Sequence, residues 1–121
     1  MEKRRRSERG MVTAETAMVV PFLVALTLAL AAAAAVGITQ VRLVDAAREG
    51  ARMAARGDEP GEVVEGVQSM APVGATVTTA RRDDDTVEVT VRLRARVDLP
   101  VVRAFSLPLA ASAVSAAEAA P

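Results

Sequence analysis

The sequence contains no cysteine, histidine, tryptophan or tyrosine, and its only aromatic residues are Phe22 and Phe105. Without Cys and His it lacks the residues of the usual zinc sites, of thiol nucleophiles and of Ser-His-Asp triads. It also has no Gly-rich phosphate loop and no convincing pair of catalytic carboxylates. We therefore expect that the protein is not an enzyme and uses no cofactor or small-molecule substrate.

Charge is distributed unevenly, although the formal net charge over the 121 residues is zero. Residues 1–10 carry five basic side chains against two acidic ones, a net charge of +3, and no charged residue lies between Glu15 and Arg42. A helix of 26 residues, Thr16 to Val41, is about 39 Å long and can cross a hydrocarbon core of about 30 Å. The basic flank predicts a cytoplasmic N-terminus and an extracytoplasmic chain from Arg42 onward.

Three interpretations of the apolar run are open. In the first, a signal peptidase cuts near Ala33, because Ala31–Ala35 offers several small-x-small sites. This cut would release a soluble binding protein. The run is longer, however, than the 7–15 residues usual for a signal peptide. The second interpretation is a permanent single-pass anchor, and the third depends on Glu15.

Glu15 is the fifth residue after Gly10, where the basic stretch ends. At the membrane interface its carboxylate could simply complement the positive N-terminal end of the helix. The spacing, however, resembles the leader of type IV pilins, in which a prepilin peptidase cuts after the glycine. This resemblance implies a cleavage site between Gly10 and Met11 and a role for Glu15 in leader recognition and assembly. In a filament, Glu15 could neutralise the α-amino group of a neighbouring subunit among apolar helices, where an unpaired charge is costly.

Two further segments resemble one branch of these proteins. Residues 15–21 are similar to the E-x-A-x-x-x-P opening of TadE-like proteins, the minor pilins or pseudopilins of tight-adherence (Tad) pilus systems, and residues 47–52 to their A-R-E-G-A-R segment. The resemblance covers about residues 9–57. Thr16 stands where the major Flp-type pilins tend to carry tyrosine, which favours a minor pilin. The implied partners are a prepilin peptidase, other pilin-like subunits and a pilus assembly platform.

The first helix is expected to kink at Pro21, because proline frees a backbone carbonyl that a membrane helix must satisfy again. Outside the membrane it is predicted to continue over residues 42–57 and to stop at Gly57. Apolar residues recurring at helical spacing predict its buried face: Val41, Val44, Ala47, Ala51, Ala54 and Ala55.

The rest of the chain predicts a short helix and three strands. Asp58 is expected to cap the helix, with Pro60 in its first turn and Val63, Val64, Val67 and Met70 on one side. Strict alternation predicts a strand over 86–99, paired with 75–81 through a turn at 82–85. Pro100 and Pro108 are expected to bracket a connection before a last strand over 110–117.

Two charged groups in this part of the chain are candidate binding sites. Asp83–Asp85 lack the ligand spacing of a calcium loop, so we expect no metal site. Arg92, Arg94 and Arg96 share the outward strand face with Glu88 and Asp98 and have no aromatic platform beside them. This pattern favours a mixed-charge solvated face over a nucleic-acid site.

The sequence thus predicts a pilin-like α+β protein: a long N-terminal transmembrane and amphipathic helix, then a short helix and a small antiparallel sheet. We expect four segments, which are a basic leader (1–10), a transmembrane helix (11–41), its continuation (42–57) and an extracytoplasmic α+β domain (58–121). The predicted function is that of a minor pilin or pseudopilin in the cytoplasmic membrane, taking part in Tad pilus assembly.

Overall fold

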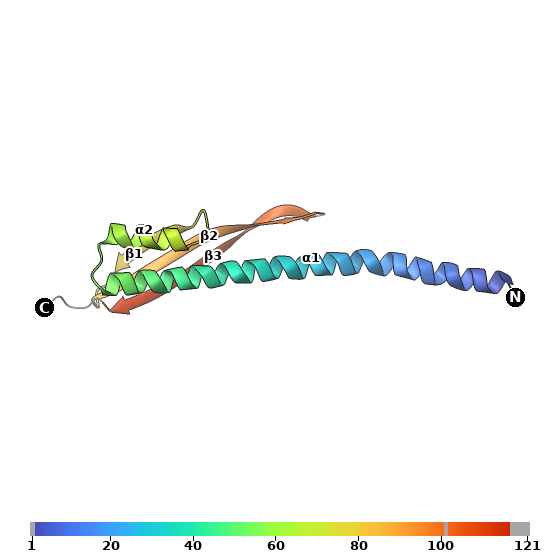
Figure 1. Cartoon of the computed structure of the whole chain (residues 1–121), viewed down its shortest axis with the longest axis horizontal. Helices are drawn as coiled ribbons and strands as arrows, with labels where there is room; N and C mark the ends of the chain where they lie inside the picture. The colour runs from blue at the N-terminus through green and yellow to red at the C-terminus, as the bar shows by residue number, and fades with distance from the viewer. Residues whose placement is uncertain (1, 101, 117–121) are drawn as a thin grey trace. The chain divides into compact units, whose positions relative to one another are not determined.

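The computed structural model describes residues 2–100 and 102–116, which form two helices and three strands (Figure 1). In chain order they are α1 (Glu2–Ala55), α2 (Pro60–Met70), β1 (Thr76–Arg81), β2 (Thr86–Leu99) and β3 (Val102–Ala116). A long apolar N-terminal helix, a short helix and a three-stranded antiparallel sheet confirm the predicted pilin-like α+β class. Met1 of the predicted leader and residues 117–121 of the predicted domain lie outside the described residues.

The chain divides into two units, with the boundary between Ala34 and Ala35. In the first unit, α1 is a single helical stretch whose side chains are nearly all exposed, and the helix continues through Pro21. Its threonine hydroxyls bond within the helix: Thr13, Thr16 and Thr27 donate to the carbonyl oxygens four residues earlier, at 2.8–2.9 Å. These three hydroxyl groups therefore have hydrogen-bond acceptors within the helix itself and need none from another segment.

The sheet of the second unit has the strand order β1-β2-β3, with both pairs antiparallel. Residues 82–85 form the predicted turn: the Arg82 amide donates to the Thr86 carbonyl at 2.8 Å, and Asp85 adopts a positive φ of 58°. Along β2 the predicted alternation holds, since Val89 and Val91 are fully buried while Arg92 and Arg94 are exposed. A half-buried strand of this kind presents one face to the core and the other to solvent.

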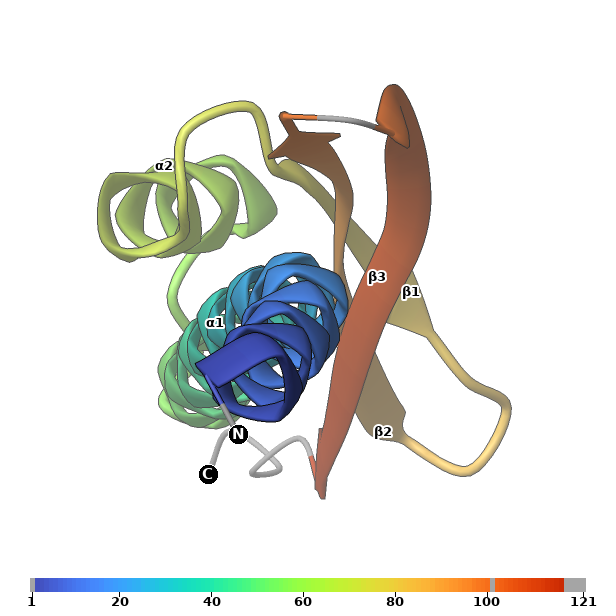
Figure 2. The same cartoon turned by 90° about the vertical axis from the view of Figure 1, so that its right-hand side faces the viewer.

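The core lies on one side of the sheet, where the C-terminal part of α1 and α2 pack (Figure 2). Leu43 of α1 and Val63 and Val67 of α2 are completely or almost completely buried, against Val89 and Val91 of β2. Hydrophobic burial of this kind is the main favourable term in folding. Because the sequence contains no cysteine, no disulfide supplements this cluster, and the stability of the unit depends on its packing.

Gly50 lies where α1 packs tightly against both α2 and β2. A Cβ atom there would lie 2.5 Å from a methyl of Val67 and 2.9 Å from a methyl of Val89. Both neighbours are β-branched and have little rotamer freedom with which to move aside. Only glycine therefore lets α1 pack against α2 and β2 at once.

Gly50→Val is expected to lower the free energy of unfolding by about 1–3 kcal/mol more than Gly61→Val does, because it overpacks the core. Gly61 is the matched control, since a Cβ on it meets nothing within 4 Å and the change in helix propensity from glycine to valine is similar. Thermal unfolding of the full chain in detergent, followed by circular dichroism, measures the difference. Equal losses for the two variants would show that the contact at Gly50 is unimportant.

The predicted buried face of α1 is partly wrong. Val41 is 60% exposed, whereas Leu43, which was not predicted, is fully buried. Two residues turn a helix by about 200°, so these two side chains lie on nearly opposite faces. The buried stripe is made by Leu43, Ala46, Ala47, Gly50 and Ala51.

The ends of the helices need one correction. The stop at Gly57 is confirmed: α1 ends at Ala55, Gly57 has a φ of 88°, and the Asp58 amide donates to the Met53 carbonyl. The residue that caps α2, however, is Glu59 and not Asp58, and it makes no side-chain capping bond. Asp58 instead pairs with Arg56 at 3.4 Å, and Pro60 takes the first helical position, where its missing N–H costs nothing.

The last strand is longer than predicted. Residues 102–109 belong to β3 and do not form a connection, and Pro108 pairs with Arg94 inside the ladder. An edge strand can hold a proline, because one side of it has no partner strand to receive an N–H. Ala117, the predicted end of the strand, lies outside the described residues.

Candidate functional site

The four residues predicted to act in processing and assembly all lie on α1, within the first unit. Gly10, Met11, Glu15 and Pro21 are exposed, and a Cβ on Gly10 would meet nothing within 4 Å. Met11 and Glu15 are four residues apart and so share one helix face. Side chains in a helix tilt toward its N-terminus, so the Glu15 carboxylate points back toward the Met11 end.

The apolar run that follows has the features of a membrane span. Among the described residues, α1 is the one helix long and apolar enough to cross a membrane, and its best 18-residue window has a mean hydropathy of 2.5. None of that window is buried in the protein, and large side chains such as Met18 (83%) and Phe22 (67%) are widely exposed. An exposed apolar surface of this extent marks a site of contact with membrane or protein.

The second family-like segment, residues 47–52, lies in the core of the second unit. Its small residues Ala47, Gly50 and Ala51 are buried, and its arginines Arg48 and Arg52 are exposed. Arg52 pairs with Glu49 at 3.1 Å. The segment therefore acts in packing: its small residues admit α2 and β2, and its charges keep the opposite face in solvent. The sequence predicts the segment but not this role of Gly50. The signal for that role is the presence of a glycine inside a predicted helix.

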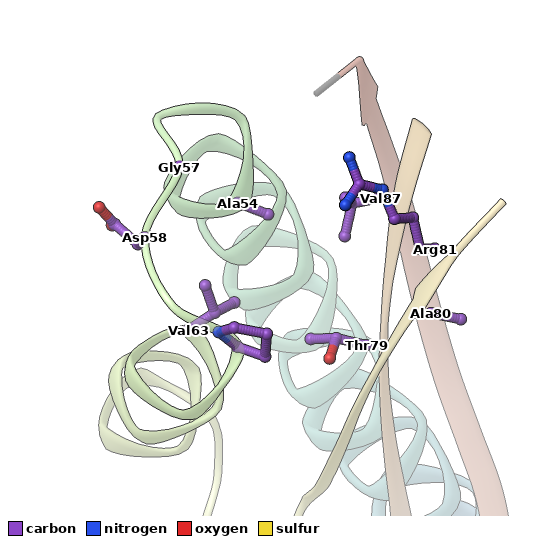
Figure 3. A pocket seen from close by; sticks show the side chains of 9 residues that line it. Ala54, Gly57, Asp58, Val63, Thr79, Ala80, Arg81 and Val87 are labelled. Carbon is purple, nitrogen blue, oxygen red and sulfur yellow. The ribbon is translucent and has the colours of Figure 1, made fainter. Parts of the chain in front are cut away.

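An open cleft of about 480 Å³ lies where the end of α1, the start of α2 and strands β1 and β2 meet (Figure 3). Apolar or small side chains supply most of its lining, and Asp58 and Arg81 are its charged members. Asp58 pairs with Arg56, and Arg81 lies 3.8 Å from Asp85. Asp58 is thus the cleft's one carboxylate, and no nucleophile–base pair lines it, so the cleft holds no set of groups for acid–base catalysis.

The acidic turn at 83–85 has a structural role. The Thr86 hydroxyl donates to the Asp84 carboxylate, and this hydrogen bond lowers the pKa of Asp84 below its ordinary value. Within residues 2–100 and 102–116, no group of three or more carboxylates converges in the manner of a metal site. The turn thus closes the hairpin between β1 and β2.

These features define a class: an α+β protein of pilin type, with one long apolar N-terminal helix and a small antiparallel sheet. The comparison with protein families makes this more specific. Residues 10–52 match the family described as TadE-like protein, so this part of the chain is similar to that family. The resemblance predicted from Glu15, Pro21 and residues 47–52 is therefore confirmed. No curated protein and no solved structure matches the chain.

Proposed function

We propose that this protein is a minor pilin or pseudopilin of a Tad pilus system. A prepilin peptidase removes residues 1–10, and α1 then holds the mature chain in the cytoplasmic membrane with the second unit outside. The observation that carries the proposal is the Gly10–Glu15 pair, at the junction of a basic segment with an uncharged run and inside the family-matched region 10–52. The other partners are further pilin-like subunits and the assembly platform.

The exposed side chains of α1 support the membrane location. A spanning segment must satisfy its polar groups internally, because no water is present in the hydrocarbon core. Thr16 and Thr27 meet this requirement through bonds to the carbonyls of Val12 and Leu23. The same apolar surface suits helix–helix packing, and the small side chains of Ala31–Ala35 allow close approach.

The position of Glu15 supports its role in assembly. Cleavage after Gly10 would create an α-amino group on Met11, one helical turn from Glu15. Each mature helix would then carry a cation and an anion close together at the edge of an apolar surface. Two adjacent helices staggered by about one turn can pair the Glu15 of one with the α-amino group of the other.

The N-terminal residue of the mature protein, determined by mass spectrometry in a host with a prepilin peptidase, tests the proposal. We expect Met11, and we expect Gly10→Val to leave the precursor intact, because the peptidase needs a small residue at the cut site. Val12→Ala, next to the site, is the control and should be processed normally. A terminus near Ala34 would identify an exported soluble protein, and a terminus at Met1 a permanent anchor; either result contradicts the proposal.

A further inference from the structure

The outer face of the sheet carries a row of positive charge. Arg92, Arg94 and Arg96 alternate with inward residues of β2, and all three are exposed. Alternate residues of a strand lie about 6.8 Å apart, so the three side chains form a line of about 14 Å. Arg96 pairs with Asp98 at 3.3 Å. Arg92 and Arg94 take part in no ion pair within residues 2–100 and 102–116. We call Arg92, Arg94 and Arg96 the arginine face.

Helix α2 carries the opposite charge. Glu62 and Glu65 are one turn apart and exposed, and Glu59 is exposed at the N-cap. No Lys or Arg occurs between Asp58 and Ala80. Glu62 and Glu65 form no ion pair with the part of the chain that the structure describes. We call Glu59, Glu62 and Glu65 the acidic face.

The two faces lie on opposite sides of the second unit. Helix α2 lies on the inner side of the sheet (Figure 2), where Val63 and Val67 are buried. The arginine face lies on the other side, because its residues alternate along β2 with the buried Val91 and Val97.

Glu88 and Asp98 also lie on the outward side of β2, but Glu88 pairs with Arg82 at 2.8 Å and Asp98 pairs with Arg96. Within residues 2–100 and 102–116, the outward side of β2 is therefore left with the unpaired charge of Arg92 and Arg94, and α2 with that of Glu62 and Glu65. A surface that serves only solubility needs no such separation, because mixed signs serve it as well.

We propose that the arginine face of one copy docks the acidic face of a second copy. The exposed side of α2, about 16 Å long for its 11 residues, is similar in length to the row of arginines, which is about 14 Å long. Because the two faces are different and lie on opposite sides, the contact is heterologous. Each copy keeps one face free for the next, so the second units stack in an open row. This goes beyond the proposed function, because it concerns the second unit and does not require cleavage after Gly10.

Cross-linking of the full chain in detergent micelles detects the contact. The protein has no cysteine, so Ser69→Cys on α2 and Ser106→Cys beside Arg96 serve as unique reporters. Both positions are exposed, each on one of the two faces. Mixing the two variants with a bifunctional thiol reagent should give a heterodimer whose yield falls as salt rises, because surface charge pairs are screened. A yield no higher than that from two copies of Ser69→Cys would contradict the stacking.

Charge reversal gives the decisive measurement. On the reporter chains, Arg92→Glu with Arg94→Glu should lower the yield about tenfold or more, and Glu62→Arg with Glu65→Arg should do the same. Mixing the two reversed chains should restore it, since each then presents a face complementary to the other. Arg42→Glu with Arg48→Glu makes the same charge change elsewhere and should have no effect. Thermal unfolding of each variant confirms that it is folded.

Two outcomes would overturn the proposal. One is a yield that reversal leaves unchanged, or that mixing the reversed chains fails to restore. The other combines two results: the cross-link between copies is weak for every chain, and Arg92→Glu with Arg94→Glu abolishes binding to vesicles of anionic lipid. This outcome would assign the arginine face to lipid headgroups. The N-terminus of the mature protein is measured separately, so failure of the stacking and failure of the proposed pilin function are distinguishable.

Discussion

Glu15→Ala is expected to reduce recovery of the protein in assembled pili by more than tenfold. Removing one partner of a buried ion pair leaves the other charge uncompensated, at a cost of about 3–5 kcal/mol, and 1.4 kcal/mol already corresponds to tenfold. In the proposed assembly, the uncompensated charge would be the α-amino group of a neighbouring Met11. Sheared pili and membranes, compared by quantitative immunoblotting, give the measurement.

Two variants separate the charge of Glu15 from other causes. Glu15→Gln keeps the size of the side chain and should fail to assemble as Glu15→Ala does. Because the loss of a charge makes insertion into the membrane easier, poor insertion would not explain this failure. Glu8→Gln removes an equivalent carboxylate from the predicted leader, which the proposed cleavage would remove, and this variant should assemble normally. If Glu15→Ala left maturation, subunit association and piliation unchanged, Glu15 would have no pilin role.

Leu43→Ala is expected to lower the free energy of unfolding by about 2–5 kcal/mol, because it leaves a cavity in the core of the second unit. Leu43 is fully buried, and it lies in one cluster with Val63, Val67, Val89 and Val91. For a domain of this size, each kcal/mol moves the Tm by about 4–8 °C. Thermal unfolding of the full chain in detergent, followed by circular dichroism, measures the shift.

Val41→Ala is the matched control, because it shortens a side chain two residues away on the same helix that is 60% exposed. Its effect should stay within about 0.5 kcal/mol. A larger loss for Val41→Ala than for Leu43→Ala would mean that the helix packs with the face that the apolar spacing predicted. The pair of variants therefore tests the position of the core directly.

The comparison of Val41 with Leu43 also shows how far the sequence determines the fold. The strand over 86–99 was predictable, because alternation of valine with charged residues has one interpretation at a period of two. Around residue 41 the helix carries apolar residues on two faces, including Ile38, Val41, Leu43 and Val44. Which face becomes buried depends on the sheet and on α2, and no local pattern contains that information.

The same distinction applies to Pro108 and to the candidate site. Locally, Pro108 predicts a break, and only its place on the edge strand of the sheet makes it compatible with a ladder. The Gly10–Glu15 spacing is visible in the sequence, because five residues on one helix need no tertiary contact to be recognised. The role of Gly50 is not visible in the sequence, because it depends on contacts with Val67 and Val89, which are distant along the chain.

Pro108 has a consequence for how the sheet resists uncontrolled growth. A free edge is a template on which a foreign strand can add and fibrils can nucleate. In β3 the proline offers no N–H to such a strand, which interrupts the template near the middle of its 15 residues. The opposite edge, β1, has only six residues and ends at Arg81. Both edges of the sheet are thereby protected against amyloid-like strand addition.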